Sequence, residues 1–268
     1  MRMIRDLFWS VCAVTGIVFL AYNNHVLANP IDDNCPQFVL RGAPVSKLQN
    51  TQYLCKTNYA IHYRYDTKTA EYVVEHVTKE SVTGSSKRED DFRPDQAIPK
   101  QYRSLLSDYS GFPYDRGHLA PAGNNTQSED IMSESFLLSN MIPQVPNNNR
   151  GIWKQLETYI RNWVLEGKDI YVVSGTHYKA DRALTIGEGK VGVPSFVWKV
   201  IVDRKNAKAI AFYMPNTALP VKDLPKYALS VRELESIVGL NFHPNIPAEL
   251  EYIETAKPNL EEWSGLHQ

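Results

Sequence analysis

The feature of this chain that most constrains its fold is the irregular succession of strand-like and helix-like segments. Residues 59–65 and 70–77 alternate between apolar and polar side chains, are rich in Val and Tyr, and flank a short polar turn, so they predict a β-hairpin. Three further strands are expected over residues 169–174, 195–203 and 208–214. Because the segments follow no repeating βαβ order, we predict an α+β fold with a mainly antiparallel central sheet flanked by helices.

One longer amphipathic helix is expected from about Asn147 to Glu166. Its apolar residues recur at spacings of three and four, as they do on the buried face of a helix. Asn147 or Asn148 would serve as the N-cap, and Gly167 would end the helix.

Three other segments complete the outline of the fold. Residues 231–238 predict a short helix, and residues 136–139 predict a short strand. Residues 80–114 are polar and contain three prolines, which predicts a long ordered loop. Long loops in compact domains are often functional.

The first 28 residues have the anatomy of a secretory signal. Arg2 and Arg5 precede an apolar run over residues 7–22, and small residues lead up to Ala28. The alternative is an uncleaved membrane anchor, because the run is only slightly shorter than a span of about 20 residues. Cleavage is the favoured interpretation, and it predicts a secreted or periplasmic protein with no stable membrane association.

The charge balance limits how such a protein could bind nucleic acid. The formal net charge is −1, and removing Arg2, Arg5 and Asp6 with the signal changes it to about −2. This is not the strongly basic balance of bulk nucleic-acid binders. If the substrate is nucleic acid, the positive charge has to be concentrated locally.

Two cysteines remain after cleavage, Cys35 and Cys55. In an oxidising compartment an isolated pair predicts a disulfide, which would staple an irregular N-terminal segment (residues 29–57) ahead of a single domain over residues 58–268. A zinc site is the alternative. It would need two further ligands at short spacing, and no Cys-x-x-Cys is present.

The segment Asp115-Arg116-Gly117-His118 is the strongest indication of chemistry in the sequence. A lone histidine is usually structural or simply exposed, and we give the other six that interpretation. His118 differs because an arginine and a carboxylate lie within three residues of it, and Gly117 permits a close backbone approach. A histidine near its unperturbed pKa can take a proton from water at neutral pH.

Carboxamide side chains gather between Asn140 and Asn149. Asparagines before a helix are commonly caps and turn formers, which accounts for one of the three at residues 147–149. A carboxamide oxygen is also a hard ligand that suits Mg²⁺. On a regular helix beginning near Asn147, Glu157 lies two turns beyond Asn149 and is rotated from it by about 80°. Both side chains could then border one cleft.

Two other stretches are less specific. The charge run at residues 87–95, which includes Arg88, is most simply a solvated loop. The glycines at residues 189–194 do not form a P-loop, because the Gly-Lys-Ser/Thr ending is absent. Together with residues 195–199 they are expected to be structural.

Taken together, these stretches resemble the DNA/RNA non-specific endonucleases, the ββα-metal family that includes mitochondrial endonuclease G. The resemblance covers roughly residues 57–240 in a consistent order. Its motifs are the Asp-Arg-Gly-His box, an Asn-x-x-Pro-Gln segment, the pattern Asn-Arg-Gly-x-Trp-x-x-Leu-Glu, a charged loop ending in Asp-Phe-Arg-Pro-Asp, and Gly-Lys-Val-x-Val-Pro followed by Trp-Lys. The resemblance implies a ββα-metal active-site motif within the α+β fold.

The resemblance also implies the two central roles. His118 would be the general base that deprotonates the attacking water. Asn149 would be the single direct protein ligand of Mg²⁺, for which Mn²⁺ could substitute, with the ion acting as a Lewis acid on the scissile phosphate.

Five further residues match supporting positions. Arg88 would neutralise charge in the transition state, and Arg116 would contact phosphate or brace the site. Asp115 and Asn140 would support the His and Asn loops. Glu157 would accept a hydrogen bond from metal-bound water.

The implied activity is hydrolysis of DNA and RNA with little sequence preference, leaving 5′-phosphate and 3′-hydroxyl ends. An inhibitor protein is a possible partner, and the oligomeric state stays open. Two alternatives remain: a catalytically silent nuclease-like module that binds nucleic acid, since fold alone does not give function, and a phosphodiesterase that acts on small diesters.

Overall fold

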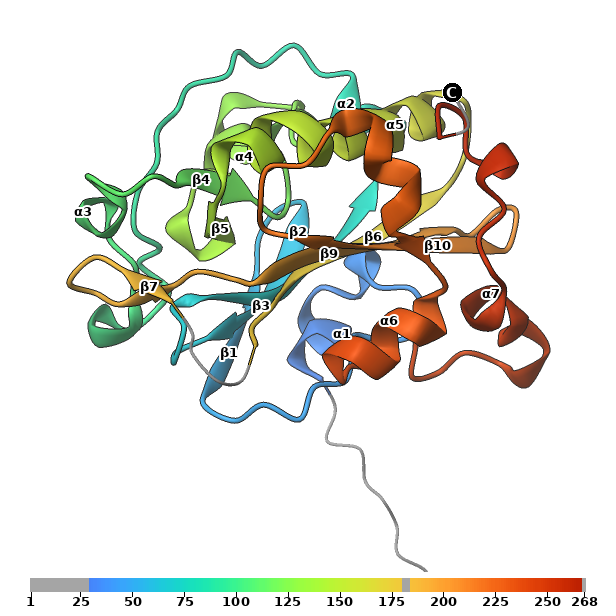
Figure 1. Cartoon of the computed structure of the whole chain (residues 1–268), viewed down its shortest axis with the longest axis horizontal. Helices are drawn as coiled ribbons and strands as arrows, with labels where there is room; N and C mark the ends of the chain where they lie inside the picture. Colours follow the sequence, from blue (N-terminus) through green and yellow to red (C-terminus); the bar gives the residue numbers. More distant parts are fainter. Residues whose placement is uncertain (1–28, 180–183, 267–268) are drawn as a thin grey trace, which may run out of the picture.

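The structure is a computed structural model that describes residues 29–179 and 184–266 (Figure 1). The predicted signal peptide, residues 1–28, lies outside the described residues. Across the part of the chain that is described, no helix has both the length and the apolar character that crossing a membrane requires.

A seven-stranded sheet forms the centre of the fold, and each pair of neighbouring strands is antiparallel (Figure 1). Along the sheet the strands are β1 (Thr51–Cys55), β2 (Tyr59–Arg64), β3 (Thr69–Val77), β6 (Ile170–His177), β9 (Phe196–Asp203), β10 (Lys208–Pro215) and β11 (Ala228–Leu229). Two small two-stranded sheets are β4 (Asp115–His118) with β5 (Met141–Gln144), and β7 (Thr185–Ile186) with β8 (Val191–Gly192). The α+β prediction is confirmed, as are the hairpin and the three later strands.

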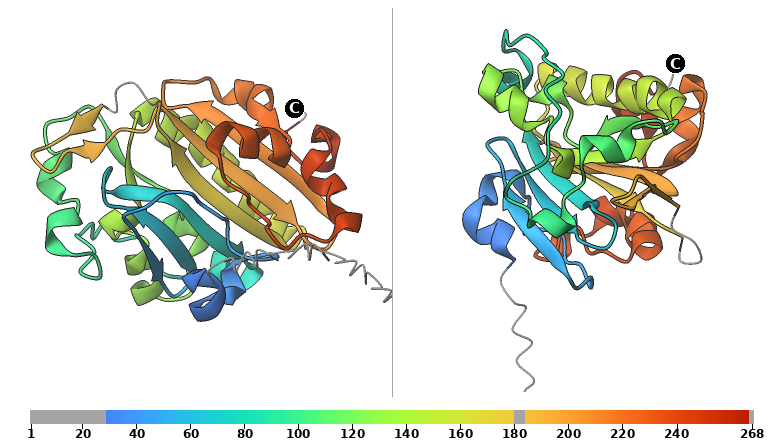
Figure 2. Two further views of the ribbon diagram at one scale, coloured as in Figure 1. Left: turned by 90° about the horizontal axis from the view of Figure 1, so that it is seen from below. Right: turned by 90° about the vertical axis from the view of Figure 1, so that its left-hand side faces the viewer.

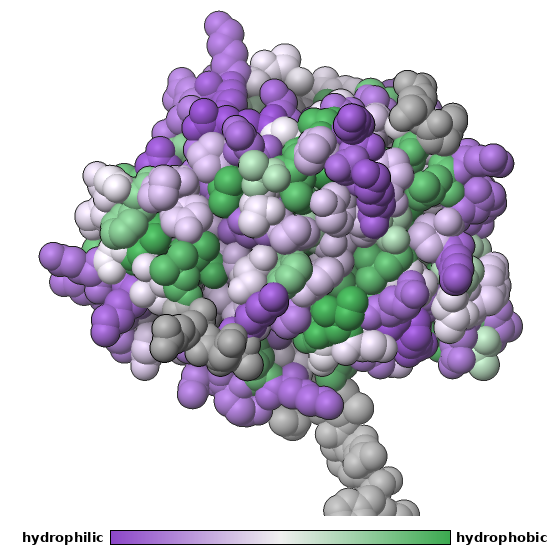
Figure 3. Space-filling model, in the orientation of Figure 1, coloured by the Kyte–Doolittle hydropathy of each residue, from purple (hydrophilic) through white to green (hydrophobic). Residues whose placement is uncertain are grey.

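Helices lie on both faces of the central sheet (Figures 1 and 2). The α-helices are α1 (Pro30–Asn34), α2 (Lys79–Val82), α3 (Leu106–Tyr109), α4 (Glu129–Glu134), α5 (Lys154–Leu165), α6 (Val231–Val238) and α7 (Tyr252–Thr255). The segment η5 (Asn148–Trp153), which is broken at Gly151, leads into α5, and short 3₁₀ helices are η1 (Pro36–Phe38), η2 (Lys100–Tyr102), η3 (Ala122–Asn124), η4 (Leu138–Asn140), η6 (Val221–Tyr227), η7 (Ala248–Leu250) and η8 (Leu260–Glu262). Polar side chains cover most of the face seen in Figure 3, interrupted by small apolar areas.

Successive side chains of a strand point to opposite faces of the sheet, and here both faces are buried. In β9, Val197 and Ile201 belong to the core beneath α5, whereas Trp198 and Val200 belong to the core that includes Leu234 of α6. Burial on both faces explains why the strands read as nearly continuous apolar runs.

The start of the long helix differs from the prediction. Asn147 stands at the expected N-cap position of this segment, but its side chain makes no capping hydrogen bond. The side chain of Asn148 is buried and is used elsewhere: its Oδ1 accepts from Gln144 Nε2 at 2.8 Å, and its Nδ2 donates to the carbonyl of Pro215 at 3.0 Å. The helical path before α5 is interrupted at Gly151, whose φ and ψ of −105° are not helical. As expected, Gly167 follows the end of α5 with a positive φ of 91°.

The short strand expected over residues 136–139 is also wrong. Phe136 and Leu138 are fully buried, but they lie in a turn and in η4, and the strand begins only at Met141. Their apolar character reflects burial on all sides rather than the alternation of a strand. Residues 80–114 form the expected long loop, interrupted by α2, η2 and α3.

The N-terminal segment is less irregular than the sequence suggests. Residues 51–55 form the edge strand β1, because their backbone pairs with β2 from Thr51 opposite Arg64 to Cys55 opposite Ala60. The expected Cys35–Cys55 disulfide is present and joins the end of α1 to this edge strand. The alternative zinc site therefore does not apply.

The disulfide predicts a measurable share of the stability. Replacing both Cys35 and Cys55 by Ala should lower the free energy of unfolding by about 3 kcal/mol, because the unfolded chain then loses a cross-link that closes a loop of some 20 residues. Urea unfolding of the mature protein measures this. Wild-type protein in excess reductant should match the variant, and a variant as stable as the oxidised wild type would contradict the prediction.

Candidate active site

The two short strands β4 and β5 present the predicted residues on the α5 side of the sheet. Asp115 lies opposite Gln144 and His118 opposite Met141. A Cβ atom on Gly117 would fall 2.1 Å from Oε1 of Gln144, so glycine at this position makes room for the Gln144 side chain.

His118 is more enclosed than the sequence suggests, since only 8% of its surface is exposed. Its ring meets Phe136 edge-on with centroids 5.0 Å apart and lies 5.8 Å from the ring of Phe92. Its Nε2 atom is buried and has no hydrogen-bond partner in the described part of the chain. The guanidinium of Arg88 lies over the ring of Phe136, 5.0 Å from its centroid.

This environment changes the acid–base behaviour of the imidazole. Burial, together with the nearby positive charge of Arg88, lowers the pKa of His118 from 6.5 to about 3. The expectation of a nearly unperturbed pKa is therefore wrong. Two phenylalanines exclude the water that would stabilise an imidazolium, so the ring is neutral and keeps a lone pair that can accept a proton.

The backbone around His118 is held by side chains from two other elements. The indole Nε1 of Trp153 donates to the carbonyl of His118 at 3.1 Å. The amide of Asn140 accepts from the N–H of Ala120 at 2.9 Å and donates to the Ala120 carbonyl at 2.8 Å. Asn140 thus holds the segment that follows His118 in place, which agrees with the supporting role expected for it.

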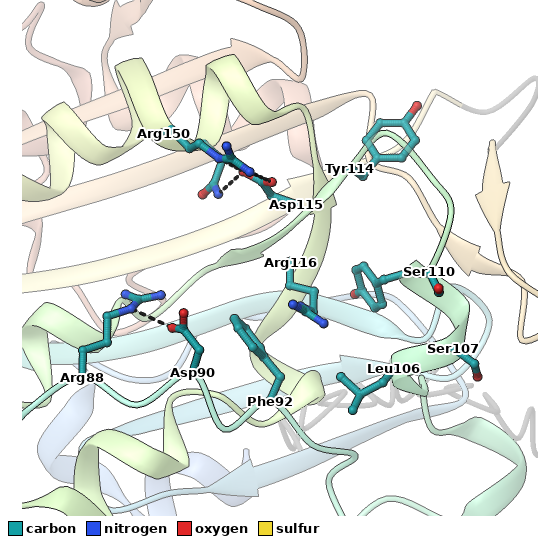
Figure 4. Close-up of a pocket in the computed structure, with 12 residues that line it drawn as sticks. Arg88, Asp90, Phe92, Leu106, Ser107, Ser110, Tyr114, Asp115, Arg116 and Arg150 are labelled. Carbon is teal, nitrogen blue, oxygen red and sulfur yellow. Dashed lines mark hydrogen bonds and ion pairs between the residues drawn. The ribbon is translucent and has the colours of Figure 1, made fainter.

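Asp115 links the strand β4 to the first turn of η5. Its Oδ2 accepts from Nδ2 of Asn149 at 2.9 Å, and the guanidinium of Arg150 donates to both carboxylate oxygens at 2.8 and 2.6 Å (Figure 4). Partial burial opposes ionisation, but these hydrogen bonds outweigh it and hold the pKa of Asp115 below its ordinary value. The carboxylate therefore stays charged and fixes the plane of the Asn149 amide.

The orientation of Asn149 fits a metal ligand. Its nitrogen is engaged by Asp115, while its oxygen accepts no hydrogen bond from the described residues, which leaves Oδ1 free to bind a cation. Asn149 is half-buried and lines a cleft. Within residues 29–179 and 184–266, no three His, Cys, Asp or Glu side chains are grouped to hold a metal, so an ion here would take few protein ligands.

The cleft beside Asn149 has a volume of about 750 Å³ and carries several cations (Figure 4). Arg88, Arg116 and Arg150 line it, and Arg116 lies over the ring of Phe92 with its Cζ 4.1 Å from the centroid. The acidic Asp90, whose Oδ1 is 2.8 Å from Nε of Arg88, lines the same cleft. Asp115 lines the cleft as well, so three arginines face two carboxylates and leave a small local excess of positive charge.

Neither Glu157 nor His118 is among the residues that line this cleft, and both are buried. Glu157 is only 9% exposed, and burial raises its pKa while Lys199, Arg161 and Arg88 oppose the shift. The expected angle between Asn149 and Glu157 assumed a regular α-helix. The helical path is broken at Gly151, between the two residues, so that angle does not apply.

Several residues that build the site were not expected from the sequence. Arg150 follows Asn149 directly, yet only the fold shows that it shares Asp115. Lys199 lies in a segment interpreted as structural, and it is fully buried beneath the site. Glu75 of β3 is buried as well, and burial raises its pKa to about 7. A charged residue within an apolar strand is the signal that could have identified Lys199 and Glu75.

Comparison with known proteins places this geometry in a family. The model of the DNA/RNA non-specific endonucleases matches residues 41–249. A nuclease of Nostoc sp. is 36% identical over 223 residues, covering 78% of this chain and 80% of the relative. The human mitochondrial nuclease EXOG is 35% identical over 216 residues, covering 74% of this chain but only 59% of the relative.

Endonuclease G relatives match in both sequence and structure. Human mitochondrial endonuclease G is 33% identical over 213 residues, covering 74% of this chain and 71% of the relative. The solved complex of EndoG with EndoGI, which addresses the mechanism of EndoG inhibition, contains a chain that superposes with a TM-score of 0.71 at 29% identity, covering 80% of this chain and 93% of that one.

In sequence over most of its length, and in structure, the chain thus matches proteins named as nucleases. The chain belongs to the DNA/RNA non-specific endonucleases and is a hydrolytic nuclease of the ββα-metal fold.

Proposed function

We propose that this protein is an exported, metal-dependent endonuclease that hydrolyses phosphodiester bonds of DNA and RNA with little sequence preference, leaving 5′-phosphate and 3′-hydroxyl ends. The observation that carries the proposal is the amide of Asn149, whose nitrogen is held by Asp115 and whose oxygen is free, in a cleft lined by three arginines. Low sequence preference follows because such a cleft grips backbone phosphates rather than base edges.

Asn149 would hold Mg²⁺, or Mn²⁺ in its place, through Oδ1. When bound, the ion supplies Lewis-acid stabilisation of charge on the scissile phosphate and the leaving oxygen. Asp115 keeps the amide oriented, since the hydrogen bond from Nδ2 fixes which atom faces the ion. Glu157, with Arg88 and Lys199 nearby, would accept a hydrogen bond from water around the ion.

His118 would act as the general base. The oxygen of the attacking water forms a bond to phosphorus, its proton passes to the imidazole, and the bond from phosphorus to the 3′ oxygen breaks. The neutral ring of the free enzyme is ready to accept that proton. The negative charge of a bound phosphate favours the protonated ring and so raises its proton affinity in the complex.

The cations of the cleft would stabilise the charge that develops during the attack. Arg88 is half-exposed and lies near both His118 and Glu157, which suits a guanidinium that neutralises the transition state. Arg116, held over Phe92, would contact a phosphate. Fixed cations count most in a site from which water is partly excluded.

Export is supported by two features. The N-terminal sequence has the composition of a secretory signal, and the Cys35–Cys55 disulfide suits an oxidising compartment. An inhibitor protein that covers the cleft is proposed as a partner, because the structural neighbour was solved as a complex with an inhibitor.

The base is tested by His118→Ala. Turnover of plasmid DNA should fall by about 10²–10⁴-fold, the scale of lost general-base catalysis, while the circular dichroism spectrum stays unchanged. His76→Ala is the matched control, since His76 pairs with Asp169 away from the cleft. A near-normal rate in His118→Ala would show that another group is the base.

The metal ligand is tested by Asn149→Ala with a titration of Mg²⁺. Removal of the amide oxygen should lower turnover and raise the Mg²⁺ concentration needed for half-maximal rate; wild-type cleavage should stop in EDTA. Asn147→Ala, an exposed asparagine two residues earlier, should behave like wild type. Unchanged Mg²⁺ dependence in Asn149→Ala would show that Asn149 is not the metal ligand.

The wild type itself tests the metal-dependent activity. Absence of cleavage would favour a catalytically silent module, and cleavage that EDTA does not stop would favour another chemistry.

The role of Arg88 predicts a pH effect. Arg88→Met removes a positive charge that disfavours the imidazolium, so the pKa of His118 should rise and the acid-side fall of kcat/KM should move to higher pH. Burial, the larger cause of the shift, remains, so the limb should stay below 6.5. Arg93→Met, whose guanidinium binds Asp91 instead, should leave the limb in place. A limb that does not move in Arg88→Met contradicts this coupling.

A further inference from the structure

A short row of polar side chains crosses the otherwise apolar sheet face beneath the active site. Glu75 of β3, Ser174 of β6 and Lys199 of β9 lie on neighbouring strands, with Ser174 directly opposite Lys199 in the register. Apolar neighbours on these strands, such as Val73 and Val172, belong to the core that α5 covers. Glu75 is 3% exposed and Lys199 is fully buried. Charges in such a core are costly unless they are paired.

The ammonium of Lys199 makes contacts that lead to the catalytic strand. Its Nζ donates to the hydroxyl of Ser174 at 2.6 Å and to the carbonyl of Leu119 at 3.2 Å. It also lies 4.3 Å from the ring centroid of Trp153, as a cation over an aromatic face. Leu119 is the residue after His118, and Trp153 donates to the carbonyl of His118 itself.

We propose that Lys199 is a positioning residue for His118, acting through the Leu119 carbonyl and the Trp153 indole. Of the groups that Lys199 touches, Leu119 is joined to His118 by a peptide bond, and the Trp153 indole is joined to the His118 carbonyl by a hydrogen bond. This inference rests on the proposed function, in which His118 accepts the proton. Lys199 itself is buried and touches neither the substrate nor the cleft.

The charges around Lys199 support this arrangement. The carboxylates of Glu157 and Glu75 oppose the effect of burial, which lowers the pKa of Lys199. Glu75 also accepts a hydrogen bond from Nδ2 of Asn124 at 3.0 Å. Removing the lysine alone would leave buried carboxylates without their cation. A useful variant therefore has to change one charge of each sign.

The test is the double variant Lys199→Met with Glu75→Gln, which keeps the buried charge balanced. We expect kcat on DNA to fall by about 10- to 100-fold, since small misplacements of catalytic groups have effects of this size, while KM stays unchanged because no substrate contact is lost. A second variant, Ser174→Ala, keeps both charges and removes one hydrogen bond to the ammonium. Ser174→Ala should lower kcat by less than the double variant does. It tests the inference even if the double variant does not fold.

The matched control is His62→Gln with Glu71→Gln. This buried pair, 2.8 Å apart, lies in the core on the other face of the sheet, where His62 stacks on Tyr53. The control should lose stability and keep the kcat of wild type. A wild-type kcat in the Lys199 variants, or an equal loss in the control, would overturn the inference.

A second measurement separates this inference from the proposed function. The indole N–H resonance of Trp153 in a ¹H–¹⁵N spectrum reports the hydrogen bond to His118 without any need for activity. It should shift in both Lys199 and Ser174 variants and not in the control. Absence of cleavage by the wild type would refute the proposed function alone, whereas an unmoved indole resonance would refute the positioning role alone.

Discussion

The close approach of β4 and β5 is the contact on which the site depends. Gly117 leaves room for the Gln144 side chain against β4, and β4 carries Asp115 and His118 on one short ribbon. The strand β5 then leads through Gln144 to Asn148, whose buried amide fixes the start of η5. From that anchor the next residue, Asn149, reaches the carboxylate of Asp115. One backbone constraint thus connects the base to the metal ligand.

Burial governs the chemistry of the groups around this ribbon. His118, Glu75 and Glu157 are all enclosed, and in each of them burial is the largest cause of a pKa shift toward the neutral form. For the two glutamates, the positive charges of Lys199 and Arg161 oppose the rise in pKa that burial causes. For His118, the positive charge of Arg88 adds to the effect of burial. Burial therefore favours the neutral form of His118. For Glu75 and Glu157, the nearby cations partly oppose the same effect.

Much of this architecture follows from sequence patterns. The strands were predictable because alternating or continuous apolar runs depend on local composition, and His118, Asn149 and Asp115 stood out because polar motifs interrupt those runs. Tertiary contacts decided the rest. The helical path before α5 is broken at Gly151, the enclosure of His118 requires Phe92 and Phe136 from two other segments, and Lys199 meets Leu119 only because β9 passes beneath β4.

The edges of the central sheet have a consequence for the protein in solution. An exposed edge strand offers unpaired backbone groups on which a second chain can add, which leads to aggregation. Here the edge strand β11 has only 2 residues, and β1, with 5 residues, is tied at Cys55 to the first helix. Neither border presents a long, free template, so concentrated protein should resist strand-to-strand assembly for as long as the cross-link is intact.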